Sequence, residues 1–205
     1  QGRDGHTRAM TKGSPKLPRL AKRPGAAACG NARGGREGGT AAPEAEVDFG
    51  IRITRDGTWL HQGSPISRKP LMRLFSTVLR RDEAGDYWLV TPAERGRIEV
   101  EDAPFTAVEL AVSGAGREQA LTFRTNADDL VTADAGHPIR VDHDPASGEP
   151  SPYVLVRDRL EALILRPVYY QLVELGVEEK VGGDHLYGVW SKGGFFPLGR
   201  IEAAA

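Results

Sequence analysis

Residues 154–167, VLVRDRLEALILRP, contain the pattern on which the predicted fold depends. The run is typical of a short apolar strand, an Arg-Asp turn, a second strand, and a proline in the first turn of a helix. The earlier stretch 51–70, IRITRDGTWLHQGSPISRKP, has the same order. A shift of 98 residues aligns 66–86 with 164–184 without a gap, and five of the 21 pairs are identical. The sequence therefore predicts two related motifs packed on each other.

Each motif is expected to combine short strands with one amphipathic helix. In the first motif, Asp56-Gly57 is the strongest short hairpin signal in the chain, because both residue types tolerate positive φ. Ser67 is expected to cap a helix that includes Pro70 and runs to Arg81. Its apolar stripe is expected to pack in the core: Leu71, Met72, Leu74, Phe75, Val78 and Leu79.

Several period-two stretches follow the first helix and predict an antiparallel meander. They are DYWLVTP, GRIEVED, AVELAVS, ALTFRTN and IRVDHD, and LYGVW and GGFFPLG close the chain. We therefore expect an α+β fold of two repeated motifs, each with short antiparallel strands and one amphipathic helix. The expected divisions are a tail over 1–46, a first motif with the meander over 47–150, and a second motif over 151–205.

The first 46 residues differ from the rest in composition. They contain no Phe, Tyr, Trp, Val or Ile, and they have nine Lys and Arg residues but only four Asp and Glu residues. A segment with so little apolar surface is expected to be disordered. Basic tails can bind nucleic acid or acidic membranes. Aromatic side chains are missing from this tail, however, so neither nucleic acid nor a membrane is expected as a partner.

The composition also excludes several classes of protein. No apolar run reaches the length of a membrane span. Cys29, the only cysteine, falls in the tail, so disulfides are not expected. The lack of disulfides predicts a cytoplasmic location. The chain has no phosphate-binding loop, nucleophile elbow, zinc-protease helix or dinucleotide fingerprint. We therefore expect no cofactor, and the absence of these motifs favours a role other than catalysis.

The candidate binding residues are polar or aromatic side chains within apolar stretches. Arg68 and Arg166 each precede or open a helix, and in two packed motifs they would meet near the join and clamp a carboxylate or phosphate. Each could instead pair with an acid of its own motif. The strands beside the helices supply aromatic and histidine side chains for a pocket at that join: Trp59, His61, Tyr87, Trp88, His185, Tyr187 and Trp190.

Acidic residues allow two further interpretations. Asp102 either forms a turn before Ala-Pro-Phe or makes a carboxylate pair with Glu94 for acid-base chemistry. In HPIRVDHD, Asp142 and Asp144 would share a strand face with His137 nearby, whereas His143 points to the other face. Such residues are also ordinary at a strand end between prolines, and no metal site is expected there.

Several stretches together are similar to those of a bacterial family catalogued as domain of unknown function 1285. They are ITRDGTWLHQGSPI, YWLVTPAERGRIEVEDAPF, LTFRTNADD, PYVLVRDRLEALI and YGVWSKGGFFPLG. The likeness covers about residues 46–200. It implies a stand-alone cytoplasmic protein with an α+β fold of two repeated motifs, and a regulatory or signal-transduction role. It implies no activity, substrate, cofactor or catalytic residue.

Three functions remain open from the sequence. The first is a binding or regulatory module that holds a small anionic metabolite or a peptide between the motifs, using Arg68, Arg166, Trp59 and Tyr87. The second is a hydrolase or transferase that uses Glu94 with Asp102, or His61 with His185. The third is a scaffold that binds a protein partner through an exposed apolar face or sheet edge.

Overall fold

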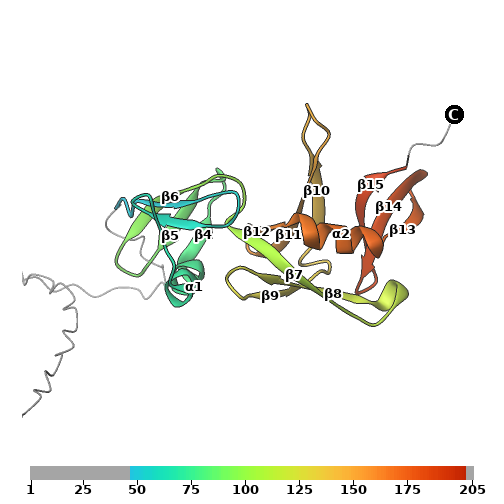
Figure 1. Ribbon diagram of the computed structural model, residues 1–205, viewed down its shortest axis with the longest axis horizontal. Coiled ribbons are helices and arrows are strands. Elements are labelled where there is room, and N and C mark those ends of the chain that lie inside the picture. Colours follow the sequence, from blue (N-terminus) through green and yellow to red (C-terminus); the bar gives the residue numbers. More distant parts are fainter. Residues whose placement is uncertain (1–46, 202–205) are drawn as a thin grey trace, which may run out of the picture. The chain divides into compact units, whose positions relative to one another are not determined.

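The computed structural model describes residues 47–201 and is built mostly of strands (Figure 1). Strand residues account for 50% of it and helical residues for 14%, and there are three sheets and two α-helices. The expected α+β class is therefore wrong. The expected tail over 1–46 and its Cys29 lie outside the described residues.

The first sheet contains six strands in the order β3-β2-β1-β6-β5-β4. Its central pair, β1 with β6, is parallel, and all other neighbours are antiparallel. The strands are β1 (Ile51–Ile53), β2 (Trp59–His61), β3 (Ser64–Pro65), β4 (Leu79–Arg81), β5 (Tyr87–Val90) and β6 (Arg95–Val100). The hairpin predicted at Asp56-Gly57 is confirmed, with Ile53 opposite Trp59.

The first helix, α1 (Lys69–Val78), packs against β5 of this sheet and is shorter than expected. Arg68 rather than Ser67 occupies the N-cap, without a side-chain capping bond. The expected last turn is strand β4, because Leu79 turns into the core and pairs with Leu89. Two of the six expected core positions, Leu71 and Leu74, are 37% and 60% exposed.

The second sheet has the order β10-β11-β12-β7-β8-β9, again with one parallel pair, β7 with β12, at its centre. The strands are β7 (Phe105–Ser113), β8 (Ala120–Thr125), β9 (Leu130–Thr132), β10 (Ile139–His143), β11 (Pro150–Arg157) and β12 (Leu160–Ile164). A 3-10 turn, η1 (Gly116–Glu118), joins β7 to β8. Both six-stranded sheets thus place the first strand of one meander beside the last strand of the next.

The third sheet is an antiparallel meander that follows α2 (Arg166–Glu174). Its strands are β13 (Val177–Val181), β14 (Asp184–Ser191) and β15 (Gly194–Arg200). The buried Ser191 hydroxyl joins it to the second sheet: it donates to the Ala133 carbonyl over 2.6 Å and accepts from the Leu121 N–H over 3.0 Å.

The predicted repeat of one helix per motif is also wrong. Helix α1 lies between the two meanders of the first sheet, whereas α2 follows the completed second sheet. The 98-residue offset therefore aligns segments that pair differently, because β6 joins the sheet of β1 while β15 belongs to a separate sheet. The expected division between the two motifs, after residue 150, falls at the start of β11. Because β10 and β11 are paired neighbours, the second sheet contains residues from both sides of this division.

One core serves the described residues. It combines Ile53, Trp59 and Leu79 of the first sheet with Phe105, Phe123 and Leu160 of the second, together with Leu172 of α2 and Val189 of β14. Neither described helix has the length and apolar character needed to cross a membrane.

Candidate functional site

A hollow of about 570 Å³ lies where the β1–β2 turn meets the start of β11 and the start of α2. A second hollow of about 310 Å³ adjoins it, and the two share Arg55, Glu149 and Ser151. We call these two hollows together the Arg55 cleft. The sheet that supplies Arg55 differs from the one that supplies Ser151, so the cleft depends on tertiary packing rather than on one local motif.

The β1–β2 turn holds Arg55 in position. Asp56 accepts hydrogen bonds from the Thr54 hydroxyl and from the Thr58 N–H, and these bonds hold the pKa of Asp56 below its usual value. Gly57 has φ of 82°, and a side chain there would meet Asn126, which donates to the Gly57 carbonyl over 2.9 Å. The turn is therefore fixed from both sides.

The Arg55 side chain reaches from the first sheet to the second. Its Nε lies 3.2 Å from Asp102 Oδ2, and its Nη2 donates to Ser151 Oγ over 3.2 Å. Its main-chain N–H donates to Glu101 Oε2 over 2.9 Å. The side chain is nevertheless 64% exposed, so part of its guanidinium still faces the cleft.

Asp102 and Tyr153 form the inner wall of the smaller hollow. The Tyr153 hydroxyl donates to Asp102 Oδ1 over 2.7 Å. Burial, together with the negative charge that accepts this bond, raises the pKa of Tyr153 to about 12. The Arg140 guanidinium lies 4.2 Å from the centre of the Tyr153 ring and makes two hydrogen bonds to Glu161. Tyr153 therefore stays protonated and serves as a fixed donor rather than a base.

Arg166 lies on the other side of the cleft as the first residue of α2. Its guanidinium pairs with Glu149, and the two side chains are 68% and 55% exposed. Tyr169, from the same helix, is half-buried in the wall, and burial raises its pKa. Pro150, Pro152 and Leu165 complete an apolar side. The larger hollow thus combines two arginines with an aromatic and apolar wall.

The acidic turn that lines the smaller hollow is internally bonded. Asp144 accepts from the N–H groups of Ser147 and Ala146, and these bonds hold its pKa below the usual value. Asp142 pairs with Arg140. No group of three or more His, Cys, Asp or Glu side chains in residues 47–201 is arranged to hold a metal ion.

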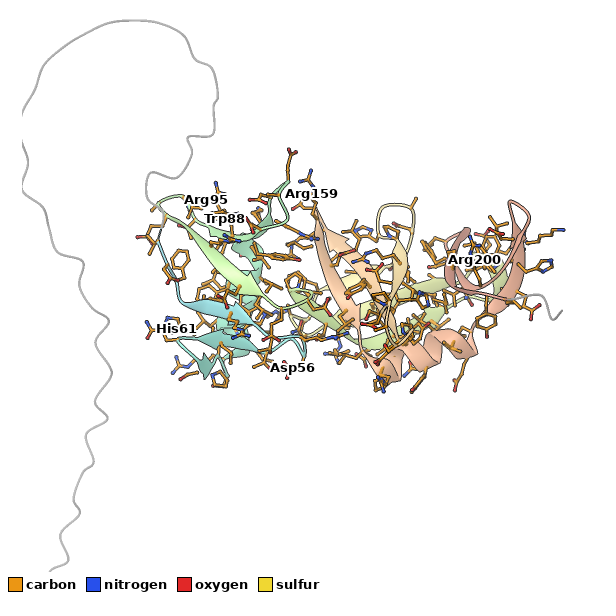
Figure 2. The ribbon with its side chains drawn as sticks, turned by 90° about the horizontal axis from the view of Figure 1, so that it is seen from above. Asp56, His61, Trp88, Arg95, Arg159 and Arg200 are labelled. Atoms are coloured by element: carbon orange, nitrogen blue, oxygen red, sulfur yellow. The ribbon has the colours of Figure 1, made fainter. Side chains whose placement is uncertain are left out.

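The structure separates the residues predicted for a binding site. Arg166 and Asp102 line the Arg55 cleft. Arg68 and His61 line a different hollow beside α1, and Trp59 is buried behind it, 2% exposed. Figure 2 shows His61 at the end of β2, away from the turn that contains Asp56. Arg68 and Arg166 therefore do not share a pocket.

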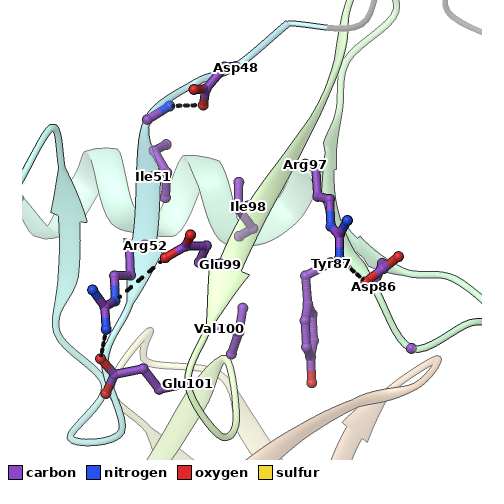
Figure 3. Close-up of a pocket in the computed structure, with 12 residues that line it drawn as sticks. Asp48, Ile51, Arg52, Asp86, Tyr87, Arg97, Ile98, Glu99, Val100 and Glu101 are labelled. Carbon is purple, nitrogen blue, oxygen red and sulfur yellow. Dashed lines mark hydrogen bonds and ion pairs between the residues drawn. The ribbon is translucent and has the colours of Figure 1, made fainter.

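The remaining predicted residues lie elsewhere. Tyr87 borders a hollow of about 870 Å³ on the first sheet, where Arg52 pairs with Glu101 and Arg97 pairs with Asp86 (Figure 3). Burial raises the pKa of Tyr87, although Arg81 lies 5.2 Å from the centre of its ring. His185 is exposed on β14 opposite Lys180.

The proposed acid-base pair does not form. Glu94 precedes β6 and Asp102 follows it, so the six residues of the strand separate them by roughly 20 Å along the chain. His61 belongs to the first sheet and His185 to the third. Sequence reasoning missed Arg55, Tyr153, Glu149 and Tyr169. The only local signal was the turn that carries Arg55, because their partners come from distant strands.

Comparisons with known proteins identify the family. Two models of a family of unknown function, DUF1285, match the chain: the N-terminal domain over residues 40–103 and the C-terminal domain over 104–198. The chain belongs to this family. Its fold is similar to the crystal structure of a DUF1285 family protein from Silicibacter pomeroyi DSS-3, with a TM-score of 0.71 and 47% identity over 82% of this chain and 91% of that one.

A second DUF1285 crystal structure, from Shewanella baltica OS155, matches with a TM-score of 0.48 and 23% identity. The match covers 61% of this chain and 91% of that one. Comparison with curated proteins gave no match. The family boundary at residues 103 and 104 falls between β6 and β7, where the first six-stranded sheet ends and the second begins.

Proposed function

We propose that this chain is a ligand-binding, regulatory module in which the larger hollow of the Arg55 cleft takes a small anionic molecule with an apolar or aromatic body. The observation that carries the proposal is the pair Arg55 and Arg166, which come from different parts of the fold and line one hollow of about 570 Å³. That volume lies within the range of about 300–1,000 Å³ common for small-molecule sites.

The chemistry of the hollow suits an anion. An arginine can hold a carboxylate or phosphate through two parallel N–H bonds, which gives direction as well as attraction. Tyr169, Leu165 and the two prolines offer apolar surface to the body of such a ligand. Glu149, the present partner of Arg166, would be displaced by the ligand's acidic group. The carboxylate of the chain thus acts as an internal competitor.

A binding role suits the lining residues better than catalysis. The residues around the larger hollow include no histidine, cysteine or lysine. The hydroxyl of Tyr153, in the adjoining hollow, is held protonated by burial and by its bond to Asp102. General acid-base or nucleophilic catalysis needs a group that titrates near neutral pH or a paired nucleophile and base. The wall of the larger hollow supplies neither, and the one histidine of the cleft, His143, lines the smaller hollow.

The test measures thermal unfolding of the full chain with aromatic and aliphatic carboxylates and phosphate monoesters. A ligand at about a hundred times its Kd adds roughly 2.7 kcal/mol. For a chain of this size the Tm should rise by about 5–11 °C. Isothermal titration then gives the affinity. We expect Arg55→Gln and Arg166→Gln to abolish binding and Glu149→Gln to strengthen it.

Arg68→Gln is the matched control. Arg68 precedes α1 as Arg166 opens α2, but it lies outside the cleft. The proposal fails if no compound in the panel raises the Tm. It also fails if binding persists in both cleft variants, or if Arg68→Gln weakens binding as much as they do.

A further inference from the structure

A groove of about 350 Å³ lies between the β2–β3 hairpin and α1, apart from the Arg55 cleft. Its apolar lining comes from Pro65 and Ile66 on one side and from Leu71 and Phe75 of α1 on the other. His61 and Arg68 stand at its rim. We call this the α1 groove.

The inner side of the α1 groove is fixed by the core. Phe75 stacks on the buried Trp59, with ring centres 6.5 Å apart and planes 10° from parallel. Ile66 donates its N–H to the Trp59 carbonyl over 2.8 Å and packs against the core. The groove is therefore formed before anything binds, which lowers the ordering cost of binding.

The outer side carries apolar surface that the fold does not use. Leu71 and Leu74 are 37% and 60% exposed, and they are three residues apart on the same helix. Residues with this spacing are neighbours on a helix surface. Together with the groove they form one apolar strip. Such a strip beside a concave groove is typical of a surface that receives a segment of another protein.

The segment that forms the groove carries side-chain charge of one sign. Residues 58–81 contain no Asp or Glu, but they include Arg68, Lys69, Arg73, Arg80 and Arg81. Arg73 and Arg81 have carboxylates at 3.8 and 3.9 Å, from Asp128 and Glu161. Within residues 47–201, Arg68 and Lys69 beside the groove have no carboxylate within 4.0 Å.

We propose that the α1 groove binds an acidic segment of a partner protein, whose large apolar side chains enter the groove while its Asp and Glu residues pair with Arg68 and Lys69. The concave shape favours a peptide over a membrane surface. A membrane-binding helix presents a broad, convex apolar face, whereas only Leu71 and Leu74 project from α1 here. The unpaired cations fit an acidic partner rather than a basic one.

The test uses the full chain and a fluorescein-labelled peptide of about twelve residues with leucine and phenylalanine anchors among glutamates. Fluorescence polarisation measures affinity, and methyl NMR locates the contact. We expect binding that weakens at least tenfold in Leu74→Ala and in the double variant Arg68→Glu, Lys69→Glu. Affinity should also fall as salt rises. Leu74 is mostly exposed, so Leu74→Ala should keep the Tm of the parent chain.

Two controls separate the alternatives. Arg166→Gln, in the Arg55 cleft, should leave peptide affinity unchanged, so failure of the cleft proposal does not affect this one. A peptide with lysine in place of each glutamate should not bind. The proposal is overturned if the acidic peptide does not bind, if the lysine peptide binds equally well, or if the variants have no effect. Binding to phosphatidylserine vesicles without peptide binding would assign the surface to membranes instead.

Discussion

The Arg157 guanidinium donates to the main-chain carbonyl of Ser76 over 2.7 Å, and thereby ties the last strand residue of β11 to the C-terminal turn of α1. The same guanidinium pairs with Asp129 at 2.8 Å and lies 5.2 Å from the centre of the Phe105 ring. The Leu79 N–H also donates to this carbonyl, at the end of the helix where regular intrahelical partners run out. Arg157 therefore adds a second donor at the helix end and connects α1 to the second sheet.

We expect Arg157→Met to lower the free energy of unfolding by about 1–3 kcal/mol, because the variant keeps the length of the side chain and loses its donors. Urea unfolding followed by circular dichroism measures the change. Arg159→Met is the control, because Arg159 pairs at 3.3 Å with Glu83, which is 92% exposed. Arg159→Met should change the free energy of unfolding by no more than about 0.5 kcal/mol. Equal losses in the two variants would show that Arg157 has no special role.

The raised pKa of Tyr153 gives a prediction about pH. Tyrosine ordinarily titrates near 10, and burial with the Asp102 contact raises the pKa of Tyr153 to about 12. The folded state thus favours the protonated hydroxyl. The stabilisation is fully present below pH 10 and is lost as the pH rises through 12.

Absorbance of tyrosinate measures this directly. The chain has five tyrosines, and we expect Tyr153 to contribute the phase that titrates at the highest pH. Tyr153→Phe should remove that phase, whereas Tyr170→Phe, at an exposed position, should leave it unchanged. An unchanged high-pH phase in Tyr153→Phe would refute the assignment.

Gly96 in β6 is expected to tolerate no side chain. A Cβ at this position would lie 2.2 Å from the Val47 carbonyl oxygen and 2.4 Å from the Phe49 ring. Gly96→Ala should therefore destabilise the chain by about 1–3 kcal/mol through overpacking. Gly199→Ala in β15 is the matched control, because no atom lies within 4 Å of its Cβ position. Thermal unfolding compares the two, and equal Tm values would contradict the prediction.

Ser191→Ala is expected to loosen the connection between the second and third sheets. The change leaves the Ala133 carbonyl and the Leu121 N–H without this partner inside the core, and each buried unpaired group costs about 1–3 kcal/mol. Hydrogen exchange should speed up at Leu121 and along β14. Ser113→Ala, at an exposed strand end, serves as control. Unaltered exchange at Leu121 would show that the hydroxyl is dispensable.

Local patterns predicted the strands well because alternation of apolar residues reports burial directly. The hairpin at Asp56-Gly57 is confirmed, and strands form at the expected meander and closing stretches. The single antiparallel meander was wrong, because β6 and β7 belong to different sheets and each is one strand of a parallel pair. The predicted end of α1 was wrong because an apolar residue such as Leu79 fits both the apolar stripe of a helix and a buried strand. The repeat was wrong because shared element order says nothing about which strands pair.

The site was less accessible to sequence reasoning because its contacts join distant residues. Arg55 meets Ser151 across 96 residues, and Tyr153 meets Asp102 across 51. Arg166 and Asp102 were expected near a binding site and line the Arg55 cleft. Their true companions, Arg55 and Tyr153, resemble an ordinary turn arginine and an ordinary strand tyrosine until the sheets are assembled.

The parallel pair at the centre of each six-stranded sheet has a consequence for synthesis. The central pair of the first sheet cannot form until β6 has been synthesised, and that of the second sheet cannot form until β12 has been synthesised. A chain emerging from the ribosome can close its hairpins early, but each sheet is completed only when its last strand appears. Pairings over such distances form slowly, so the half-made sheets with open edges are the species most exposed to aggregation.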